Sequence, residues 1–229
     1  MDRWRGNMKE IFKEFSEVKG EYVEEIAGQS RFAYSISNSD DLFEIEETVK
    51  IDGFYKGNEI CFYDYKTSEI YRPFDLKKNI AYGRVIFIDN SFYILQVDFN
   101  EGLVNIYKYY PGEILEKITD YKVKDLSTYN LELVGIDLHL ISQDSETLEI
   151  YYPYRKTVKL EVSESALFID DGKVYINRWI EEGWDDEKDE AGEDYKYYDK
   201  LIIKDFDSNI IEERLGSLHQ SPDGTWWLA

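Results

Sequence analysis

Turn aspartates are the residues of this sequence whose type and spacing best suit chemistry. Short apolar runs alternate with turns along the chain, and the aspartates at or near these turns are Asp40, Asp41, Asp89, Asp137, Asp170, Asp171 and Asp223. If the turns meet at the mouth of a propeller channel, one carboxylate from each unit would join a ring that could bind Ca²⁺ or supply the acid and base of a glycosidase. The candidate ring consists of Asp41, Asp89, Asp137, Asp170 and Asp223.

The same aspartates have an ordinary structural explanation, because an aspartate side chain can hydrogen-bond the backbone of a tight turn and tolerates left-handed dihedral angles. No other catalytic signature accompanies them: the sequence contains no G-x-S-x-G elbow, no G-x-G-x-x-G fingerprint and no P-loop. His139, His219 and Cys61 are too few for a convincing zinc site. We therefore expect no metal and no cofactor, and the sequence leans away from an enzyme without excluding one.

A second candidate site is the acidic segment 181–199, which we interpret as a loop inserted into a repeat. An EF-hand pattern starting at Asp185 fails, because its sixth position is Glu190 instead of glycine and its twelfth is Lys196 instead of glutamate. Aromatic residues accompany the charges, so the segment could anchor an interface while it steers a basic partner; a solvated loop without a partner is the alternative. The candidate partner-binding residues are Trp184, Asp185, Asp186, Asp189, Glu193, Asp194, Tyr195, Tyr197 and Tyr198.

The charge balance limits the classes of partner. The 229 residues include 27 Lys and Arg against 48 Asp and Glu, which gives a formal net charge of −21. This excess of carboxylates argues against direct binding of nucleic acid and against docking on a membrane, and it favours a basic protein partner. The single cysteine permits no intramolecular disulfide. Neither a signal peptide nor a membrane span is evident, so we expect a cytoplasmic protein if this is the whole chain.

Four aromatic-rich hairpins predict an internal repeat. Each pairs an apolar strand with a more charged strand across a short turn, and their equivalent positions are Ile60, Ile106, Ile150 and Ile203. The steps between these positions are 46, 44 and 53 residues, and the longest step contains the acidic segment. Another pair of short strands is expected ahead of each hairpin, the first of them over residues 32–45. Four strands in roughly 40–50 residues are typical of a β-propeller blade, and a β-sandwich with coincidental spacing is the alternative.

The two chain ends predict how the ring closes. The tail S-P-D-G-T-W-W-L-A, residues 221–229, would supply the inner strands of a fifth blade, and residues 20–28 would supply its outer part. Apolar residues at helical spacing predict a short amphipathic helix over residues 8–18. We therefore expect one all-β domain over residues 1–229, a five-bladed β-propeller closed by a blade shared between the N- and C-termini.

The tail also resembles the S-P-D-G-x-x-L-A element of TolB-like and WD40-like propeller repeats. The matching residues are Ser221, Pro222, Asp223, Gly224, Leu228 and Ala229. The resemblance covers nine residues, and the other repeats retain only the turn that contains aspartate. It implies a propeller fold and carries no catalytic residue with it.

These features favour a non-enzymatic protein-binding module whose acidic surface engages a basic protein. Such a partner could be a toxin or nuclease that the module neutralises, or a component of a complex for which it is the scaffold. A carbohydrate-active enzyme or lectin that uses the channel-mouth carboxylates is the alternative. An acidic mimic of nucleic acid is a third interpretation.

Overall fold

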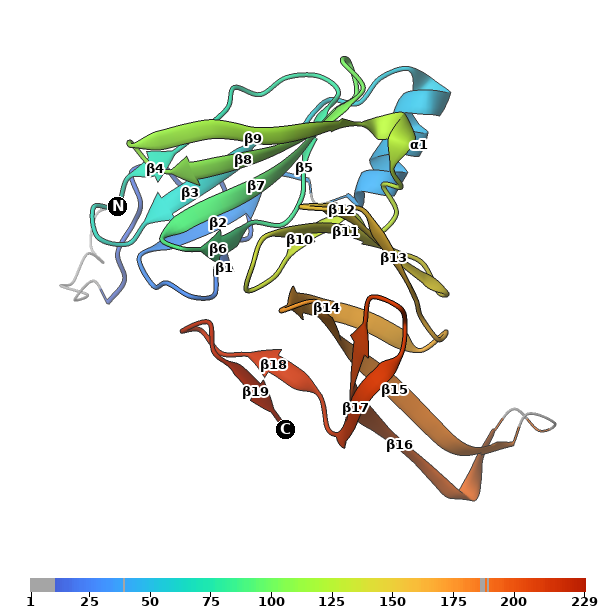
Figure 1. Ribbon diagram of the computed structural model, residues 1–229. Coiled ribbons are helices and arrows are strands. Elements are labelled where there is room, and N and C mark those ends of the chain that lie inside the picture. The colour runs from blue at the N-terminus through green and yellow to red at the C-terminus, as the bar shows by residue number, and fades with distance from the viewer. Residues whose placement is uncertain (1–10, 39, 186–187, 189) are drawn as a thin grey trace.

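Antiparallel β-sheets build most of the protein (Figure 1). The computed structural model describes residues 11–38, 40–185, 188 and 190–229. Within these residues the protein has one α-helix, α1 (Leu42–Asp52), and one turn of 3-10 helix, η1 (Val123–Asp125). The expectation of an all-β fold is confirmed.

Five sheets follow one another along the chain, and the first four are antiparallel meanders. The first sheet contains β1 (Glu24–Glu25), β2 (Phe32–Ile36), β3 (Ile60–Asp64) and β4 (Ile70–Tyr71). The second contains β5 (Ile80–Tyr82), β6 (Ile86–Ile88), β7 (Ser91–Asp98), β8 (Leu103–Tyr110) and β9 (Ile114–Lys122), with β5 and β6 both paired to β7. The third contains β10 (Glu132–Val134), β11 (His139–Gln143), β12 (Thr147–Tyr152) and β13 (Lys156–Lys159).

The fourth sheet contains β14 (Glu164–Asp170), β15 (Lys173–Asp185), β16 (Glu190–Asp205) and β17 (Ile210–Leu215), and the fifth contains β18 (Leu218–Gln220) and β19 (Trp226–Leu228). The expected hairpins correspond to the last two strands of the first four sheets. Their four equivalent isoleucines lie in β3, β8, β12 and β16, and all four are buried. The strands predicted around these four residues are therefore present.

Each sheet packs on the next one in the chain. One apolar cluster joins the first and second sheets, where the rings of Phe62 and Phe92 lie 5.1 Å apart. A second cluster joins the second and third sheets and includes Ile45 of α1, and a third joins the third and fourth sheets. The fifth sheet contacts the fourth through Trp226, whose ring lies 4.6 Å from that of Phe168. The core is thus divided among the interfaces between consecutive sheets.

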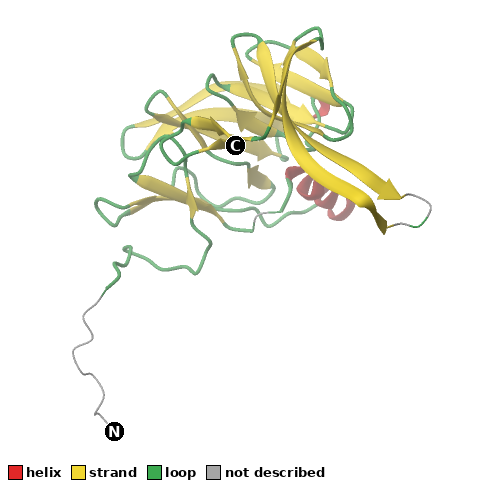
Figure 2. Ribbon diagram, turned by 90° about the horizontal axis from the view of Figure 1, so that it is seen from below, coloured by secondary structure: helices red, strands yellow, loops and turns green. Residues whose placement is uncertain are grey.

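The N-terminal segment differs from its prediction, because residues 11–18 form no helix (Figure 2). Residues 8–10 of the predicted helix lie outside the described residues. Ile11 and Val18 are 91% and 75% exposed, so no apolar surface covers the face that a helix would bury, and a short helix is unstable without such packing. Phe15 packs instead against the ring of Tyr63, at 5.1 Å between centroids.

Residues 42–45 begin α1 and do not form the second strand of the expected pair. The Asp41 carboxylate accepts a hydrogen bond from the Phe43 amide at 2.8 Å and caps the helix. Leu42 and Ile45 are buried at helical spacing, and Gly53 ends the helix in the left-handed conformation. The strand prediction over this stretch is wrong, because the Asp41 cap and the helical spacing of Leu42 and Ile45 outweigh the strand-forming composition.

The fifth sheet contains only β18 and β19 among the described residues, so the blade predicted to be shared between both chain ends is not observed. β1 pairs instead with β2 in the first sheet. The Gln29 side chain stabilises this return of the chain, because it both donates to the carbonyl of Phe32 and accepts from its amide. The first sheet still contacts the tail, since the amide of Gly28, between β1 and β2, donates to the carbonyl of Pro222 at 3.0 Å.

Candidate functional site: the central cavities and the acidic ribbon

Three adjoining cavities lie where the first strands of the sheets approach one another. We call them the mouth cavity, the inner cavity and the side cavity, and their volumes are about 490, 420 and 340 Å³. The inner cavity is lined from every sheet, by residues of β1, β6, β10, β14 and β18 or next to them. The side cavity lies between the first sheet and the tail, beside Gln29 and Pro222.

Arg84 lines all three cavities. It follows Gly83, which separates β5 from β6. A Cβ atom on residue 83 would lie 3.0 Å from the Leu95 side chain, so glycine permits the close approach to β7 at this point. The guanidinium of Arg84 makes no ion pair or hydrogen bond with any residue that the structure describes.

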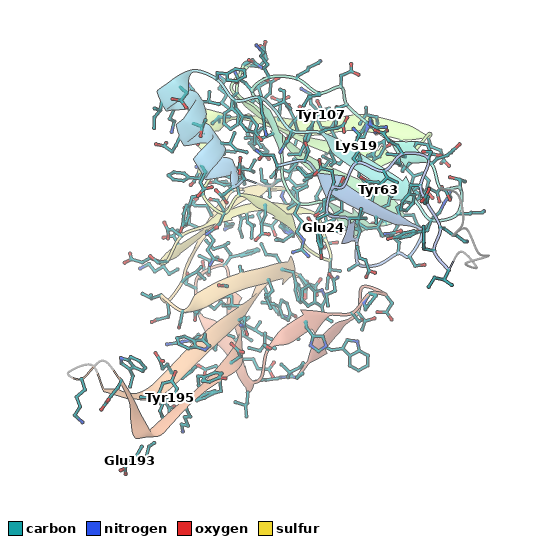
Figure 3. The ribbon with its side chains drawn as sticks, turned by 180° about the vertical axis from the view of Figure 1, so that it is seen from behind. Lys19, Glu24, Tyr63, Tyr107, Glu193 and Tyr195 are labelled. Carbon is teal, nitrogen blue, oxygen red and sulfur yellow. The ribbon has the colours of Figure 1, made fainter. Side chains whose placement is uncertain are left out.

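Three glutamates bring negative charge to the cavities: Glu24, Glu25 and Glu132. Glu24 lies near the middle of the molecule (Figure 3) and accepts a hydrogen bond from the Tyr34 hydroxyl at 2.9 Å. The carboxylate of Glu132 makes no hydrogen bond within the described part of the chain. Burial raises the pKa of Glu132, and the positive charge of Arg84 opposes this rise. Arg84 and Glu132 therefore influence each other across a shared cavity without contact.

The structure does not gather the predicted ring of carboxylates in one of these cavities. Asp41 lines the mouth cavity together with Asp40. Of the other four members, Asp89 lies at the turn between β6 and β7, and Asp137, Asp170 and Asp223 lie at the turn between the first two strands of their sheets. Asp41 instead follows β2, at the opposite end of that strand from the first turn of its sheet. None of the four lines the mouth, inner or side cavity.

Local backbone geometry accounts for several of the turn aspartates. Asp89 and Asp171 have φ angles of 47° and 45°, in the left-handed region that a tight hairpin turn requires. The Asp223 carboxylate accepts hydrogen bonds from the Ser221 hydroxyl at 2.5 Å and the Thr225 amide at 3.0 Å, and these bonds lower the pKa of Asp223. The turn-forming role that the sequence offered as an alternative is therefore observed at these positions.

The acidic segment is a projecting hairpin (Figure 1). β14 pairs with β15 no further than Arg178, and β17 pairs with β16 no further than Lys200. Beyond these residues the two strands have no flanking strand, although Trp179 and Asp199 each make one more backbone hydrogen bond, to Ser163 and from Gly216. We call residues 179–185 and 190–199 the acidic ribbon. The prediction of a loop over 181–199 is wrong, because the tryptophan and tyrosine residues among the carboxylates favour paired strands.

One side of the acidic ribbon is aromatic. Residues that alternate along a strand, and residues directly opposite on the partner strand, share a face. The pairing of Glu181 with Tyr197 therefore places Trp179 and Tyr197 on one face. The ring of Tyr195 lies 6.4 Å from that of Tyr197 and 5.8 Å from that of Trp184. We call Trp179, Trp184, Tyr195 and Tyr197 the aromatic face.

The opposite side of the ribbon carries Tyr198, which the sequence grouped with the other aromatic residues. Its hydroxyl donates to Glu182 at 2.7 Å, and Lys196 forms an ion pair with the same carboxylate at 2.8 Å. Glu193 and Asp194 are exposed near the far end of the ribbon (Figure 3). Asp185 is the last residue of β15, while Asp186 and Asp189 lie outside the described residues.

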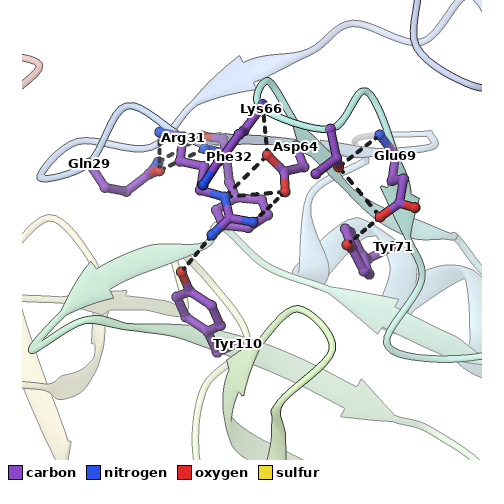
Figure 4. A network of polar contacts seen from close by, with 9 residues as sticks. Gln29, Arg31, Phe32, Asp64, Lys66, Glu69, Tyr71 and Tyr110 are labelled. Carbon is purple, nitrogen blue, oxygen red and sulfur yellow. Dashed lines mark hydrogen bonds and ion pairs between the residues drawn. The ribbon is translucent and has the colours of Figure 1, made fainter.

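An ion pair joins Arg31 and Asp64, neither of which lines any of the three cavities, although their chain neighbours Phe32 and Tyr65 line the side cavity (Figure 4). Arg31 Nη2 donates to Asp64 Oδ2 at 2.7 Å, and the amide of Lys66 donates to Oδ1 at 2.8 Å. The Asp64 side chain is fully buried, and the hydrogen bond from Arg31 lowers its pKa. This cluster ties the loop before β2 to the end of β3, which is a structural role.

Neither Arg84 nor Glu132 is among the residues predicted from the sequence. A weak sequence signal marks Arg84, because the dipeptide Gly83-Arg84 interrupts an otherwise apolar run between Ile80 and Ile88 in a strongly acidic chain. No such sequence signal marks Glu132, because its place in the same cavity depends on how two different sheets pack together.

The sequence matches no protein-family model, and comparison with curated proteins finds no similar chain. Among the described residues, no group of His, Cys, Asp and Glu side chains is arranged to hold a metal ion. The helical part of the structure, as far as it is described, contains no segment long and apolar enough to cross a membrane.

Proposed function

We propose that this protein is a non-enzymatic binding module that presents the acidic ribbon to a basic protein partner. The exposed aromatic face carries the proposal: Trp179, Trp184 and Tyr197 are 45%, 41% and 67% exposed. Large aromatic side chains at the surface are the usual anchors of protein interfaces. A hairpin that leaves its sheet contributes little to the core, so its aromatic residues are better explained by an interface than by folding.

The charge of the ribbon supports a basic partner. Segment 181–199 contains ten acidic residues against two lysines, and the whole chain carries a formal charge of −21. Such a surface accelerates encounter with a positively charged protein, and the aromatic face then supplies the desolvated contact. A cationic toxin or nuclease, or a basic subunit of a complex, fits this description.

The scaffold that we propose is a five-bladed β-propeller, with each sheet as one blade. Its support comes from three observations: consecutive sheets pack on one another, the inner cavity is lined by residues from all five sheets, and Gly28 bonds to Pro222 between the first and last sheets. A β-sandwich is the alternative. An experimental structure in which the sheets form two stacked layers would replace the propeller.

The test begins with affinity capture from lysate of the cells that make the protein, washed at increasing salt and analysed by mass spectrometry. We expect a stoichiometric basic protein whose binding weakens as salt rises. With that protein in hand, Trp184→Ala/Tyr195→Ala/Tyr197→Ala should weaken binding by at least about 100-fold, since interface aromatics dominate affinity. Tyr198→Ala on the opposite face is the matched control and should change affinity less than about threefold. Unchanged affinity of the triple variant would rule out this site.

A further inference from the structure

We propose that the mouth cavity binds a free α-amino acid, whose carboxylate pairs with Arg84 and whose ammonium group pairs with Glu132. Both residues line the mouth cavity and the inner cavity, and they approach from different sheets. Their side chains do not form an ion pair within 4.0 Å. A ligand with one negative and one positive group, separated by a few atoms, would bridge them.

The bonding of the other charged residues singles out these two. Five charged residues line the mouth cavity, and three of them are already hydrogen-bonded to the protein. Glu24 accepts from Tyr34, Asp41 from the Phe43 amide and Asp40 from Asn38. Arg84 and Glu132 are the remaining two, and neither side chain has a hydrogen bond to the part of the protein that is described.

The electrostatics of the cavity disfavour simpler ligands. A bare anion at Arg84 would face four carboxylates around the same cavity, and a bare cation at Glu132 would face the guanidinium. A neutral sugar would form no ion pair with the exposed guanidinium of Arg84 or with the half-buried carboxylate of Glu132. Burial raises the pKa of Glu132 and the charge of Arg84 opposes this rise, so the two charges interact across the cavity. The volume of about 490 Å³ lies within the range of small-molecule sites, roughly 300–1,000 Å³.

The first experiment measures thermal unfolding of the full chain with each of the twenty standard L-amino acids at millimolar concentration. We expect at least one to raise Tm by about 5 °C when it is in roughly hundredfold excess over its Kd. Propionate and ethylamine serve as half-ligands and glucose as a neutral polyol, and none should raise Tm at the same concentration. An equal rise with any of these three probes, or no rise with all twenty amino acids, overturns the proposal.

The second experiment measures Kd for the best amino acid by calorimetry. Arg84→Gln and Glu132→Gln should each weaken binding at least about tenfold, because each removes a charge-assisted hydrogen bond. Arg214→Gln and Glu113→Gln change the same residue types at exposed positions away from the cavities and should leave Kd unchanged. If Arg84→Gln does not fold, Arg84→Lys keeps the charge and loses the bidentate geometry, and it should still weaken binding. Unchanged affinity in the cavity variants overturns the assignment.

Binding of the basic protein to the ribbon is measured separately, so either proposal can fail alone.

Discussion

The two halves of the β15–β16 hairpin differ sharply although they belong to the same pair of strands. The inner half is flanked by β14 and β17, and its residues Val174, Ile176 and Ile202 are completely buried. The outer half is the acidic ribbon, which has no flanking strand and exposes most of its side chains. Strand pairing alone therefore does not determine how much a residue contributes to stability. The burial that flanking strands provide determines it.

Two ion pairs express this difference. Lys204 in the inner half and Glu164 in the flanking strand β14 are in contact at 2.5 Å, with side chains 6% and 0% exposed. Lys196 and Glu182 in the ribbon are 2.8 Å apart, with side chains 62% and 46% exposed. A buried charge that loses its partner keeps a large desolvation cost, whereas an exposed charge is resolvated by water. Similar distances thus predict very different energetic consequences.

The largest effect is expected for Lys204→Met, which leaves the Glu164 carboxylate buried without its main partner. The free energy of unfolding should fall by about 3–5 kcal/mol, measured by urea denaturation. The double variant Lys204→Met/Glu164→Leu removes both charges and should recover most of the loss. Lys196→Met in the ribbon is the matched control and should leave the urea midpoint unchanged. Equal effects of the two lysine substitutions would contradict the comparison.

A smaller effect is expected at Asp64, whose buried carboxylate accepts hydrogen bonds from Arg31 and Lys66. Asp64→Asn should lower the free energy of unfolding by about 1.5–3 kcal/mol near pH 6. Because folding lowers the pKa of Asp64, the ionised form stabilises the protein above the ordinary aspartate pKa of about 3.9. This stabilisation is lost as pH falls through the lowered pKa.

The measurement is urea denaturation of both proteins between pH 6 and pH 2.5. The difference in unfolding free energy should be full at pH 6 and should shrink progressively below about pH 4. Glu182→Gln tests an exposed carboxylate of the ribbon, whose pKa is also lowered, first by its hydrogen bond with Lys196. Its effect on stability should be undetectable at every pH. A difference at Asp64 that did not depend on pH would show that its charge is irrelevant.

The strands could be predicted from the sequence because strand formation follows a local pattern. Alternating aromatic and β-branched runs produce strands, and Ile60, Ile106 and Ile150 each lie in a strand where one is expected, namely β3, β8 and β12. The start of α1 was missed because aromatic composition was given more weight than the aspartate cap and the spacing of Leu42 and Ile45.

The candidate site could not be predicted in the same way. Arg84 and Glu132 belong to different sheets, and only the packing of those sheets brings them to one cavity. The ten carboxylates of segment 181–199 favour the prediction of a loop. The aromatic and the charged face of the ribbon become evident only from the strand register, in which Glu181 pairs with Tyr197. Non-local pairing and register are the information that a single sequence lacks.

The smallest effect on stability is expected for removal of most of the ribbon. Ile180 and Tyr198 lie directly opposite each other, so residues 181–197 can be replaced by Asn-Gly, which forms a tight two-residue hairpin turn. The urea midpoint should not change, because the deleted residues add no strand to the sheet beside β14 or β17. Binding of the basic partner should be lost. A large fall in the midpoint would show that the ribbon supports folding, and its exposed aromatic face would then no longer require a partner to explain it.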